Sequence, residues 1–546
     1  MTDDYPRPQL CRNSFFSLDG KWDLNDQPIH VPYPPQSRLS GWKDAVPADL
    51  CYTRKFDVPP SFDPERMRTI LHIGAVDQTA NIYLNGRPIC RHEGGYLPFD
   101  ADITSSLRQK DNELRIEAED HLLNIYPYGK QTNKPHGMWY TPVSGIWKSV
   151  WLEQVPAHYI TDLNISTDLE SVTLTIVTDQ DQDEAEVHIE GQDPVRIPVN
   201  QAVRIPVRDP RLWSPESPHL YHFTVAMGED RVTSYFALRT VSIIHDHSGG
   251  RVIALNGRPV FLNGLLDQGY FPDGLFLPGA PDGYEQDILR AKALGFNTLR
   301  KHIKIEPEHF YAACDRLGML VIQDMVNAGP YHYVMDTVFP NIGVKRRPDF
   351  WPGDRQRKAF FEKHCQETQD HLHNHPCVVI YTIFNEGWGQ YDTTRIYRML
   401  RRRDPSRLYI SSSGWFKGYE TDIDSEHVYF RNRVLARRDR PLMLSECGGY
   451  TYLADASNER DTYGYGKTSS PEELTACIET LYRDMVLPSI DGGLNGVIYT
   501  QLTDVEGEIN GLYTYDRRIC KVIPERLQAL ARQTYERFHE HSSIKA

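Results

Sequence analysis

Several sequence patterns that are typical of zinc-binding, disulfide-linked, secreted or membrane proteins are missing from this sequence. Its nine cysteines are odd in number and widely spaced, and no Cys-x-x-Cys pair occurs, so neither a zinc ribbon nor a disulfide framework is indicated. No apolar run approaches the roughly 18 residues of a membrane span. The N-terminus has neither the basic segment nor the apolar segment of a secretion signal. These absences predict a soluble, cytoplasmic protein with free thiols and no membrane partner.

An excess of basic charge is also absent. Lysine and arginine number 60 against 74 acidic residues, for a formal charge of -14. Because phosphate binding needs a basic surface, this balance argues against a protein that coats nucleic acid, and we expect no nucleic-acid partner. With 40% hydrophobic and 11% aromatic residues the chain can bury a large core. A length of 546 residues, at about 100–200 residues per domain, suggests roughly three domains.

The first two regions consist of short segments in which apolar and polar residues alternate, as in β-strands. In residues 1–156, segments such as Leu114–Ala118 alternate apolar and polar residues, and Asn85-Gly86 has the composition of a tight hairpin turn. No stretch there keeps a 3.6-residue apolar period, so we expect a two-sheet β-sandwich. Residues 157–244 hold strand-length alternations at closer intervals, which fits a small immunoglobulin-like sandwich.

From about residue 245 strands alternate with helices to the end of the chain. The pattern predicts helices over residues 284–294, 307–317, 355–373 and 393–403, each following a short apolar strand, with the sixth strand at 427–430. About 300 residues in eight strand–helix units are typical of a (β/α)8 TIM barrel over 245–546. A doubly wound open sheet is the alternative, but no glycine-rich turn of the right form follows the first strand.

Acidic residues dominate the predicted carboxyl ends of the barrel strands, where side chains face a shared mouth. The fourth strand ends in Asn385-Glu386 and the seventh in Ser445-Glu446. Two facing glutamates are what a retaining glycosidase needs, one to attack the anomeric carbon and one to protonate the leaving oxygen. A single glutamate after a strand is more often a helix-start residue that interacts with the helix dipole. The pair, with Arg300 on the second strand able to keep one carboxylate ionised, favours catalysis.

The chain resembles glycoside hydrolase family 2, which includes β-galactosidases, β-glucuronidases and β-mannosidases. Tyr381-Thr-Ile-Phe-Asn-Glu386 is similar to the family's acid/base strand, and Pro441-Leu-Met-Leu-Ser-Glu446 to its nucleophile strand. Residues 144–153 resemble the end of the family's N-terminal jelly-roll domain, which implies a jelly-roll for the first region. Further resemblances lie in the other two regions, at residues 211–221, 235–239 and 295–302.

This resemblance implies an exo-acting retaining hydrolase of O-glycosyl bonds, with no cofactor and a carbohydrate as its partner. It implies that Glu386 is the general acid/base, that Glu446 is the nucleophile, and that Tyr429 supports Glu446. It also implies sugar contacts from Asn385 and His302. Relatives in the family often self-associate, so a homo-oligomer is possible.

Other residues near the predicted strand ends are candidates for binding the sugar. Asp267 and Gln268, after the first strand, either bind hydroxyls or only form a turn. Trp415, near a strand end, has a ring suited to stacking on a sugar. His427 and Gln501 complete the predicted binding set.

The substrate is less determined than the reaction. The Asn-x-Lys-Gly element that the family's β-glucuronidases use near the last strand is missing, and Tyr499-Thr-Gln501 stands where many relatives have a tryptophan. We therefore expect a neutral β-hexoside, with β-galactoside first. A β-glucuronide, β-galacturonide or α-L-arabinoside specificity remains open on the same fold. A carbohydrate-binding protein without catalysis is a further alternative, against which the presence of both glutamates speaks.

A histidine- and cysteine-rich segment before the fourth strand offers one rival site, a metal centre. His371 and His375 are four residues apart, as in metal-binding helices, but Pro376 ends the helix and the segment belongs to the opposite end of the barrel. We therefore expect no metal at this cluster, which comprises His364, Cys365, His371, His373, His375 and Cys377.

Overall fold

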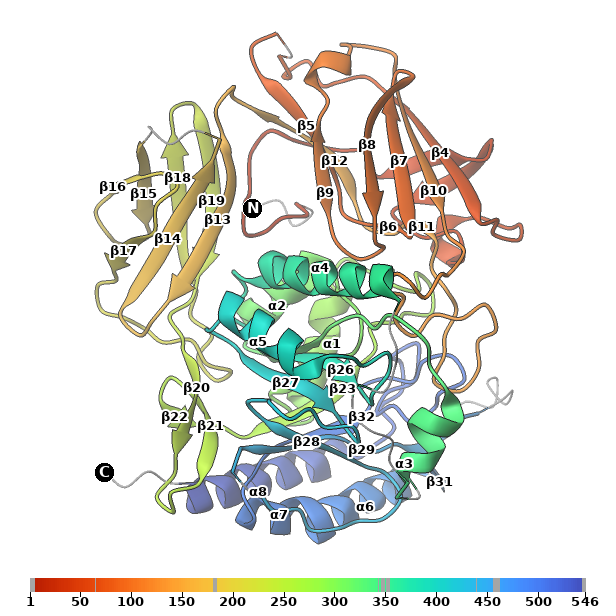
Figure 1. The fold of residues 1–546 in the computed structure, drawn as a ribbon, viewed down its shortest axis with the longest axis vertical. Helices are drawn as coiled ribbons and strands as arrows, with labels where there is room; N and C mark the ends of the chain where they lie inside the picture. Colours follow the sequence, from red (N-terminus) through yellow and green to blue (C-terminus); the bar gives the residue numbers. More distant parts are fainter. Residues whose placement is uncertain are drawn as a thin grey trace.

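The computed structural model describes residues 5–63, 65–179, 184–341, 343–344, 349, 354–437, 439–454 and 462–542. Two β-sandwiches sit side by side at one end of an elongated molecule, and a barrel forms the other end (Figure 1). The predicted fold class, two sandwiches followed by a TIM barrel, is confirmed. No helix among these residues is long and apolar enough to cross a membrane.

The first sandwich packs a six-stranded antiparallel sheet against a four-stranded one. In the central strand β10 (Asn112–Glu119), Leu114, Ile116 and Ala118 are buried between polar neighbours, which is the predicted alternation. The six-stranded sheet also contains β3 (Gln27–Val31), β2 (Gly20–Leu24), β4 (Asp49–Phe56), β7 (Thr79–Leu84) and β8 (Arg87–Glu93). The other sheet contains β1 (Phe15–Ser17), β12 (Val150–Val155), β5 (Arg68–Ile73) and β9 (Phe99–Asp102). A two-stranded pair, β6 (Val76–Asp77) and β11 (Gly145–Ile146), and the short helices η1 (Arg38–Ser40) and η2 (Thr104–Ser106) complete the sandwich.

The second sandwich is smaller and has seven strands. One sheet contains β13 (Ile160–Thr167), β14 (Ser171–Thr178) and β17 (Val203–Pro206). The other contains β16 (Val195–Pro198), β15 (Glu184–Ile189), β18 (Tyr221–Met227) and β19 (Asp230–Phe236). A three-stranded sheet, β20 (Val241–His245), β21 (Arg251–Leu255) and β22 (Arg258–Pro259), then joins the sandwich to the barrel and adds Ile253 and Leu255 to the barrel core.

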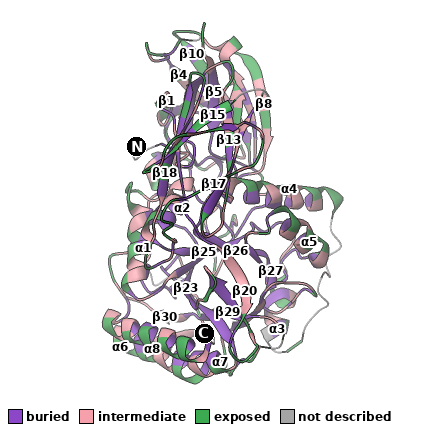
Figure 2. Cartoon of the chain, turned by 90° about the vertical axis from the view of Figure 1, so that its left-hand side faces the viewer, coloured by how far each residue is buried: buried purple, intermediate pink, exposed green. Residues whose placement is uncertain are grey.

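Eight parallel strands form a nearly closed barrel. In chain order they are β23 (Leu262–Asp267), β24 (Thr298–Lys301), β25 (Leu320–Asp324), β26 (Val378–Asn385), β27 (Leu408–Ser413), β28 (Asp424–Val428), β29 (Leu442–Gly448) and β32 (Leu494–Thr500). Most of these strands are buried along their whole length, while the outer helices expose one face (Figure 2). Burial on both faces explains why the strands read as apolar runs and do not alternate.

The barrel helices are α1 (Gly283–Ala293), α2 (Glu308–Leu317), α4 (Arg355–Leu372), α5 (Thr393–Arg403), α6 (Pro471–Leu481), α7 (Leu487–Asp491) and α8 (Pro524–Ser542). The four helices predicted by range lie within a residue or two of their predicted positions, as α1, α2, α4 and α5, and the barrel has further helices for which no range was predicted. Shorter elements are η3 (Val334–Val338), α3 (Phe339–Asn341), η5 (Tyr482–Val486), β30 (Tyr450–Tyr452) and β31 (Gly466–Thr468).

Two details of the predicted barrel are wrong. The expectation of a helix in every unit fails, because no helix follows β27 or β28 in the parts of residues 414–441 that the structure describes. The sixth strand runs over Asp424–Val428 and not over 427–430. Its pairing with β29 aligns Asp424 with Leu442, and this register places Tyr429 just beyond the strand end.

Candidate active site

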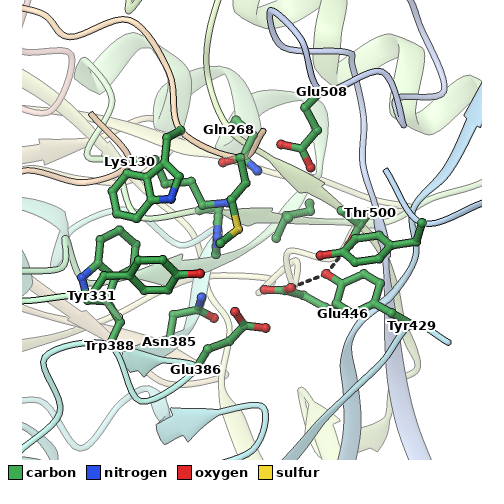
Figure 3. A pocket seen from close by; sticks show the side chains of 15 residues that line it. Lys130, Gln268, Tyr331, Asn385, Glu386, Trp388, Tyr429, Glu446, Thr500 and Glu508 are labelled. Carbon is green, nitrogen blue, oxygen red and sulfur yellow. Dashed lines mark hydrogen bonds between the residues drawn. The ribbon is translucent and has the colours of Figure 1, made fainter. Parts of the chain in front are cut away.

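A cavity opens at the carboxyl ends of the barrel strands, and a loop of the first sandwich forms part of its lining (Figure 3). That loop runs between β10 and β11 and contributes Lys130, Met138 and Trp139. The barrel contributes Leu266, Gln268, His302, Tyr331, Asn385, Glu386, Trp388, Tyr429, Glu446, Tyr465, Thr500 and Glu508.

Two glutamates face each other across this cavity. Glu386 follows β26 directly and has a positive φ of 50°, an uncommon conformation for a residue with a side chain. Glu446 lies within β29. One carboxylate oxygen of Glu386 lies within 4.8 Å of one of Glu446. Retaining glycosidases hold their two carboxyl groups about 5–5.5 Å apart and inverting ones about 6.5–9.5 Å apart, so this short spacing is nearer to the retaining arrangement.

The surroundings of the two carboxyl groups drive their pKa values apart. Burial raises the pKa of Glu386, and the charge of Glu446 raises it further. Burial alone would also raise the pKa of Glu446, but His427 and Arg300 beside it lower that pKa to about 2. The shifts therefore favour the protonated form of Glu386 and the ionised form of Glu446, the kind of difference that gives two neighbouring carboxyl groups different roles.

Arg300 is a buried cation next to Glu446 and, after His427, the neighbour that most lowers the pKa of this carboxyl group. It is fully buried, and its Nη1 donates to Glu446 Oε1 at 2.9 Å. Its Nη2 donates to Asn385 Oδ1 at 2.9 Å, and its Nε to Asp324 Oδ1 at 3.0 Å. Because the guanidinium is planar, these bonds fix the two strand-end side chains relative to each other.

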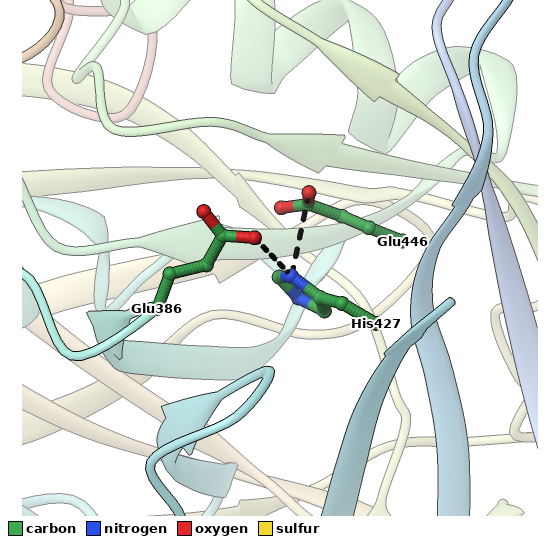
Figure 4. Close-up of side chains that lie close together, drawn as sticks. All are labelled: Glu386, His427 and Glu446. Atoms are coloured by element: carbon green, nitrogen blue, oxygen red, sulfur yellow. Dashed lines mark hydrogen bonds and ion pairs between the residues drawn. The ribbon is translucent and has the colours of Figure 1, made fainter. Parts of the chain in front are cut away.

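His427 lies between the two glutamates (Figure 4). Its Nδ1 is 2.7 Å from Glu386 Oε1 and 3.4 Å from Glu446 Oε2. Tyr429, just past the end of β28, donates its hydroxyl hydrogen to Glu446 Oε2. Strand β28 therefore supplies one side chain that touches both carboxylates and brings in a second that supports Glu446.

Three models of one protein family match the chain in succession. They are a glycosyl hydrolase 2 galactose-binding domain-like model at residues 39–162, a glycosyl hydrolases family 2 model at 156–239, and the TIM barrel domain of family 2 at 250–436. The chain belongs to glycoside hydrolase family 2. The predicted family is confirmed.

The proteins that this family-2 chain resembles in sequence include β-galactosidases and β-glucuronidases. A β-galactosidase of Aeromonas hydrophila is 27% identical over 414 residues, which is 69% of this chain and 37% of that protein. A β-glucuronidase of Streptococcus agalactiae is 25% identical over 375 residues, covering 62% of this chain and 58% of that protein. The solved β-D-glucuronidase of Dictyoglomus thermophilum has a TM-score of 0.78 at 19% identity and covers 97% of this chain and 98% of that one. The chain spans less than half the length of the β-galactosidases that it matches first.

The structure gathers most of the predicted site residues of this family-2 chain at the cavity, in two layers. Gln268, His302, Asn385 and Tyr429 line the cavity together with the two glutamates. Behind them, Arg300 and His427 contact the glutamates, and Gln501 accepts a hydrogen bond of 2.9 Å from Gln268.

Two predicted sugar contacts lie elsewhere. Asp267 does not line the cavity; its carboxylate accepts a hydrogen bond from Lys301 Nζ at 2.6 Å in a buried ion pair. Trp415 packs edge-on against His427 with ring centres 5.8 Å apart and does not line the cavity either. The structure places Asp267 against Lys301 and Trp415 against His427, and their contacts with a sugar stay predictions.

The rival histidine and cysteine cluster is not gathered into one site. His375 Nδ1 lies 2.6 Å from Asp315, and His371 Nδ1 lies 3.8 Å from Glu308. Within the described part of the chain, Glu386, His427 and Glu446 are the only group of three whose potential ligand atoms lie within 4.8 Å of one another.

Sequence patterns did not point to Lys130, Trp139, Tyr331 or Tyr465, although all four line the cavity. The first two come from the first sandwich and the others from loops after β25 and before β31. For Lys130 and Trp139 the sequence offers one indirect sign. Residues 120–144 show neither a strand period nor a helix period, and such a long irregular segment is often functional.

Proposed function

We propose that this chain is an exo-acting retaining glycosidase that removes one terminal sugar by double displacement. The observation that carries the proposal is the pair Glu386 and Glu446, with carboxylate oxygens within 4.8 Å and pKa values shifted in opposite directions.

Each residue has a defined part in this reaction. The Glu446 carboxylate attacks the anomeric carbon while Glu386 gives its proton to the departing glycosidic oxygen, which forms a glycosyl ester on Glu446. Glu386, now ionised, takes a proton from water, and that water cleaves the ester to release the sugar and restore both residues. Asn385, held by Arg300, offers its amide to a sugar hydroxyl.

The sandwich loop at the cavity supports exo action. Lys130, Met138 and Trp139 reach the cavity from the first sandwich and form part of its lining. A cavity that is closed on one side suits the terminal sugar of a glycoside better than an internal sugar of a long polysaccharide.

A β-galactoside is our first substrate, in line with the names of several relatives. A β-uronide is the second candidate, and Lys130 favours it. No hydrogen bond or ion pair of the Lys130 ammonium group occurs among the described residues, and this group faces the cavity in which a sugar carboxylate would lie. Glu508, on the same side of the cavity in Figure 3, would oppose that carboxylate. An α-L-arabinoside is the third candidate, because the same pair of glutamates would cleave it.

Two glutamate variants test the mechanism. Glu446→Gln is expected to abolish turnover of nitrophenyl glycosides, and Glu386→Gln to lower kcat about 10²–10⁴-fold with poor leaving groups. Glu426→Gln serves as the matched control, because Glu426 lies on β28 but pairs with Lys417 outside the cavity. Full activity in both Glu446→Gln and Glu386→Gln would refute the mechanism. A wild-type chain that binds sugars but hydrolyses none would favour the non-catalytic alternative.

A panel of nitrophenyl glycosides separates the substrates: galactoside, glucuronide, galacturonide, mannoside and arabinoside. If a uronide is the best substrate, Lys130→Gln is expected to lower its kcat/KM relative to the neutral glycosides, whereas Lys43→Gln, an exposed lysine of the first sandwich, leaves the ratio unchanged. A ratio that Lys130→Gln does not alter would exclude the lysine from substrate selection.

A further inference from the structure

A second and wider groove adjoins the catalytic cavity, with a volume of about 1070 Å³. Met138, Trp139 and Tyr331 line both spaces, so the groove and the cavity share one wall. The remaining groove residues come from the loop of the first sandwich, from the segment after β25 and from Tyr463. They are Leu122, Asn124, Tyr128, Gln131, Thr132, Asn133, Lys134, His136, Gly137, Pro330, His332 and Tyr333.

The shared wall lies on the side of the general acid. In Figure 3 Tyr331 and Trp388 stand near Glu386, whereas Tyr429 and Thr500 stand near Glu446. Tyr331 packs against Trp388, two residues after Glu386, with ring centres 5.4 Å apart. In double displacement the leaving group departs past the acid, on the face away from the nucleophile. The groove therefore begins where the leaving group has to be.

The groove lining combines aromatic rings with hydrogen-bonding side chains. Trp139 and Tyr331 pack with ring centres 5.1 Å apart, and Tyr333 is 57% exposed. The side chains of Asn133, Lys134 and His136 are exposed in the same groove. Rings can cover the C–H faces of a sugar while amide, ammonium and imidazole groups meet its hydroxyls, so this mixture suits a carbohydrate better than a wholly apolar group.

The wall of the groove is held in place by the protein's own hydrogen bonds. Tyr128 N donates to Asn327 O at 3.0 Å, and Gly329 N donates to Asn124 O at 2.8 Å. The Tyr128 hydroxyl donates to Gly329 O at 3.0 Å. These bonds join the sandwich loop to the barrel segment after β25, and a surface fixed in this way loses less conformational entropy on binding.

We propose that this groove binds a sugar residue on the leaving-group side of the scissile bond, so that the preferred substrates are di- or oligosaccharides. The assignment rests on the proposed function, since it takes Glu386 as the acid.

The test compares two substrates that share the terminal sugar found active in the panel. One is its methyl β-glycoside and the other its β-1,4-linked disaccharide with glucose; for a galactoside these are methyl β-D-galactoside and lactose. Tyr333→Ala and His136→Ala are each expected to lower kcat/KM for the disaccharide about three- to tenfold relative to the methyl glycoside. Tyr419→Ala, a tyrosine that is 78% exposed and outside the groove, is the matched control and should leave the ratio unchanged.

Three outcomes decide between the possibilities. An active enzyme whose ratio is the same in all variants overturns the groove assignment while the proposed function stands. A larger loss on the nitrophenyl glycoside than on the disaccharide overturns the sugar assignment in favour of an aromatic leaving group. If the wild-type chain hydrolyses none of these substrates, the proposed function fails, and calorimetric titration with lactose then tests the groove by itself. Lactose binding that Tyr333→Ala weakens supports a sugar-binding groove. No lactose binding, or equal binding by wild type and Tyr333→Ala, overturns it.

Discussion

The pKa values of Glu386 and Glu446 shift in opposite directions because the neighbours of the two carboxyl groups differ. Glu446 has the Arg300 guanidinium at 2.9 Å and the Tyr429 hydroxyl as donors, and both stabilise its charged form. Glu386 forms no ion pair with an arginine or lysine among the described residues; its side chain contacts His427, and its near neighbour is the negative Glu446. Because His427 contacts both carboxylates, a change in the protonation of one alters the surroundings of the other.

This difference predicts the pH dependence of the reaction. Glu386 must be protonated to act as an acid, so kcat/KM is expected to stay level below its raised pKa and to fall about tenfold per pH unit above it. Glu446, with a pKa of about 2, stays ionised through the same range and adds no acidic limb near neutral pH. A pH–rate profile with a nitrophenyl glycoside checks this. The basic limb should vanish in Glu386→Gln, and a limb that persists unaltered there belongs to another group.

At the scale of elements, the barrel strands fit tightly enough to leave some positions without a side chain. Gly264, in β23, faces β32 on one side and β24 on the other. A Cβ atom there would lie 2.6 Å from Ile498 Cδ1 and 2.8 Å from the Thr298 carbonyl oxygen. Strand β23 leads directly to Gln268 at the cavity, so its position matters for the site.

Gly264→Ala is therefore expected to destabilise the barrel by about 1–3 kcal/mol through overpacking. Thermal denaturation followed by circular dichroism measures the loss. Ile498→Val removes the Cδ1 atom that the new methyl group meets, so the double variant should recover part of the stability lost by Gly264→Ala. Equal stability of Gly264→Ala and wild type would mean that β23 and β32 are further apart than described.

At the scale of the whole molecule, buried charges join parts of the chain that are distant in sequence. Arg12, near the N-terminus, donates to Glu153 Oε2 on β12 of the first sandwich at 3.0 Å. It also donates to Asp230 Oδ1 on β19 of the second sandwich at 3.0 Å. All three side chains are less than 5% exposed, so one arginine links both sandwiches away from water.

Arg12→Met leaves two buried carboxylates without their cation and is expected to cost about 3–5 kcal/mol, seen as a lower urea midpoint. Burial would raise the pKa of Glu153, but His72 and Arg12 lower it. A depressed pKa in the folded state adds stability above the ordinary value of about 4.3, and this contribution is lost as the pH falls. The difference in the free energy of unfolding between Arg12→Met and wild type should therefore become smaller as the pH falls. Arg12→Met with Glu153→Leu and Asp230→Leu should recover part of the loss; no recovery would locate the effect outside this network.

Local sequence patterns are enough to predict the three-part architecture and the two glutamates. A period of two marks half-buried strands such as β10, and apolar runs between helical segments mark barrel strands buried on both faces. Since strands of a barrel share one direction, residues at their carboxyl ends meet whatever the details of the fold. That geometric rule is sufficient to predict that Asn385, Glu386 and Glu446 lie together.

The rest depended on the tertiary structure. Nothing periodic marks Lys130 or Trp139, and both reach the barrel from a different domain, more than 240 residues before Glu386 in sequence. The partners of Asp267 and Trp415 could not be read from sequence either, since their neighbours arrive from other elements. The sequence by itself determined which chemistry the strand ends carry, because strand direction is a local property. Only the packed chain decided which residues of the first sandwich line the cavity and which side chains touch the glutamates, because those contacts depend on the docking of domains and the register of distant strands.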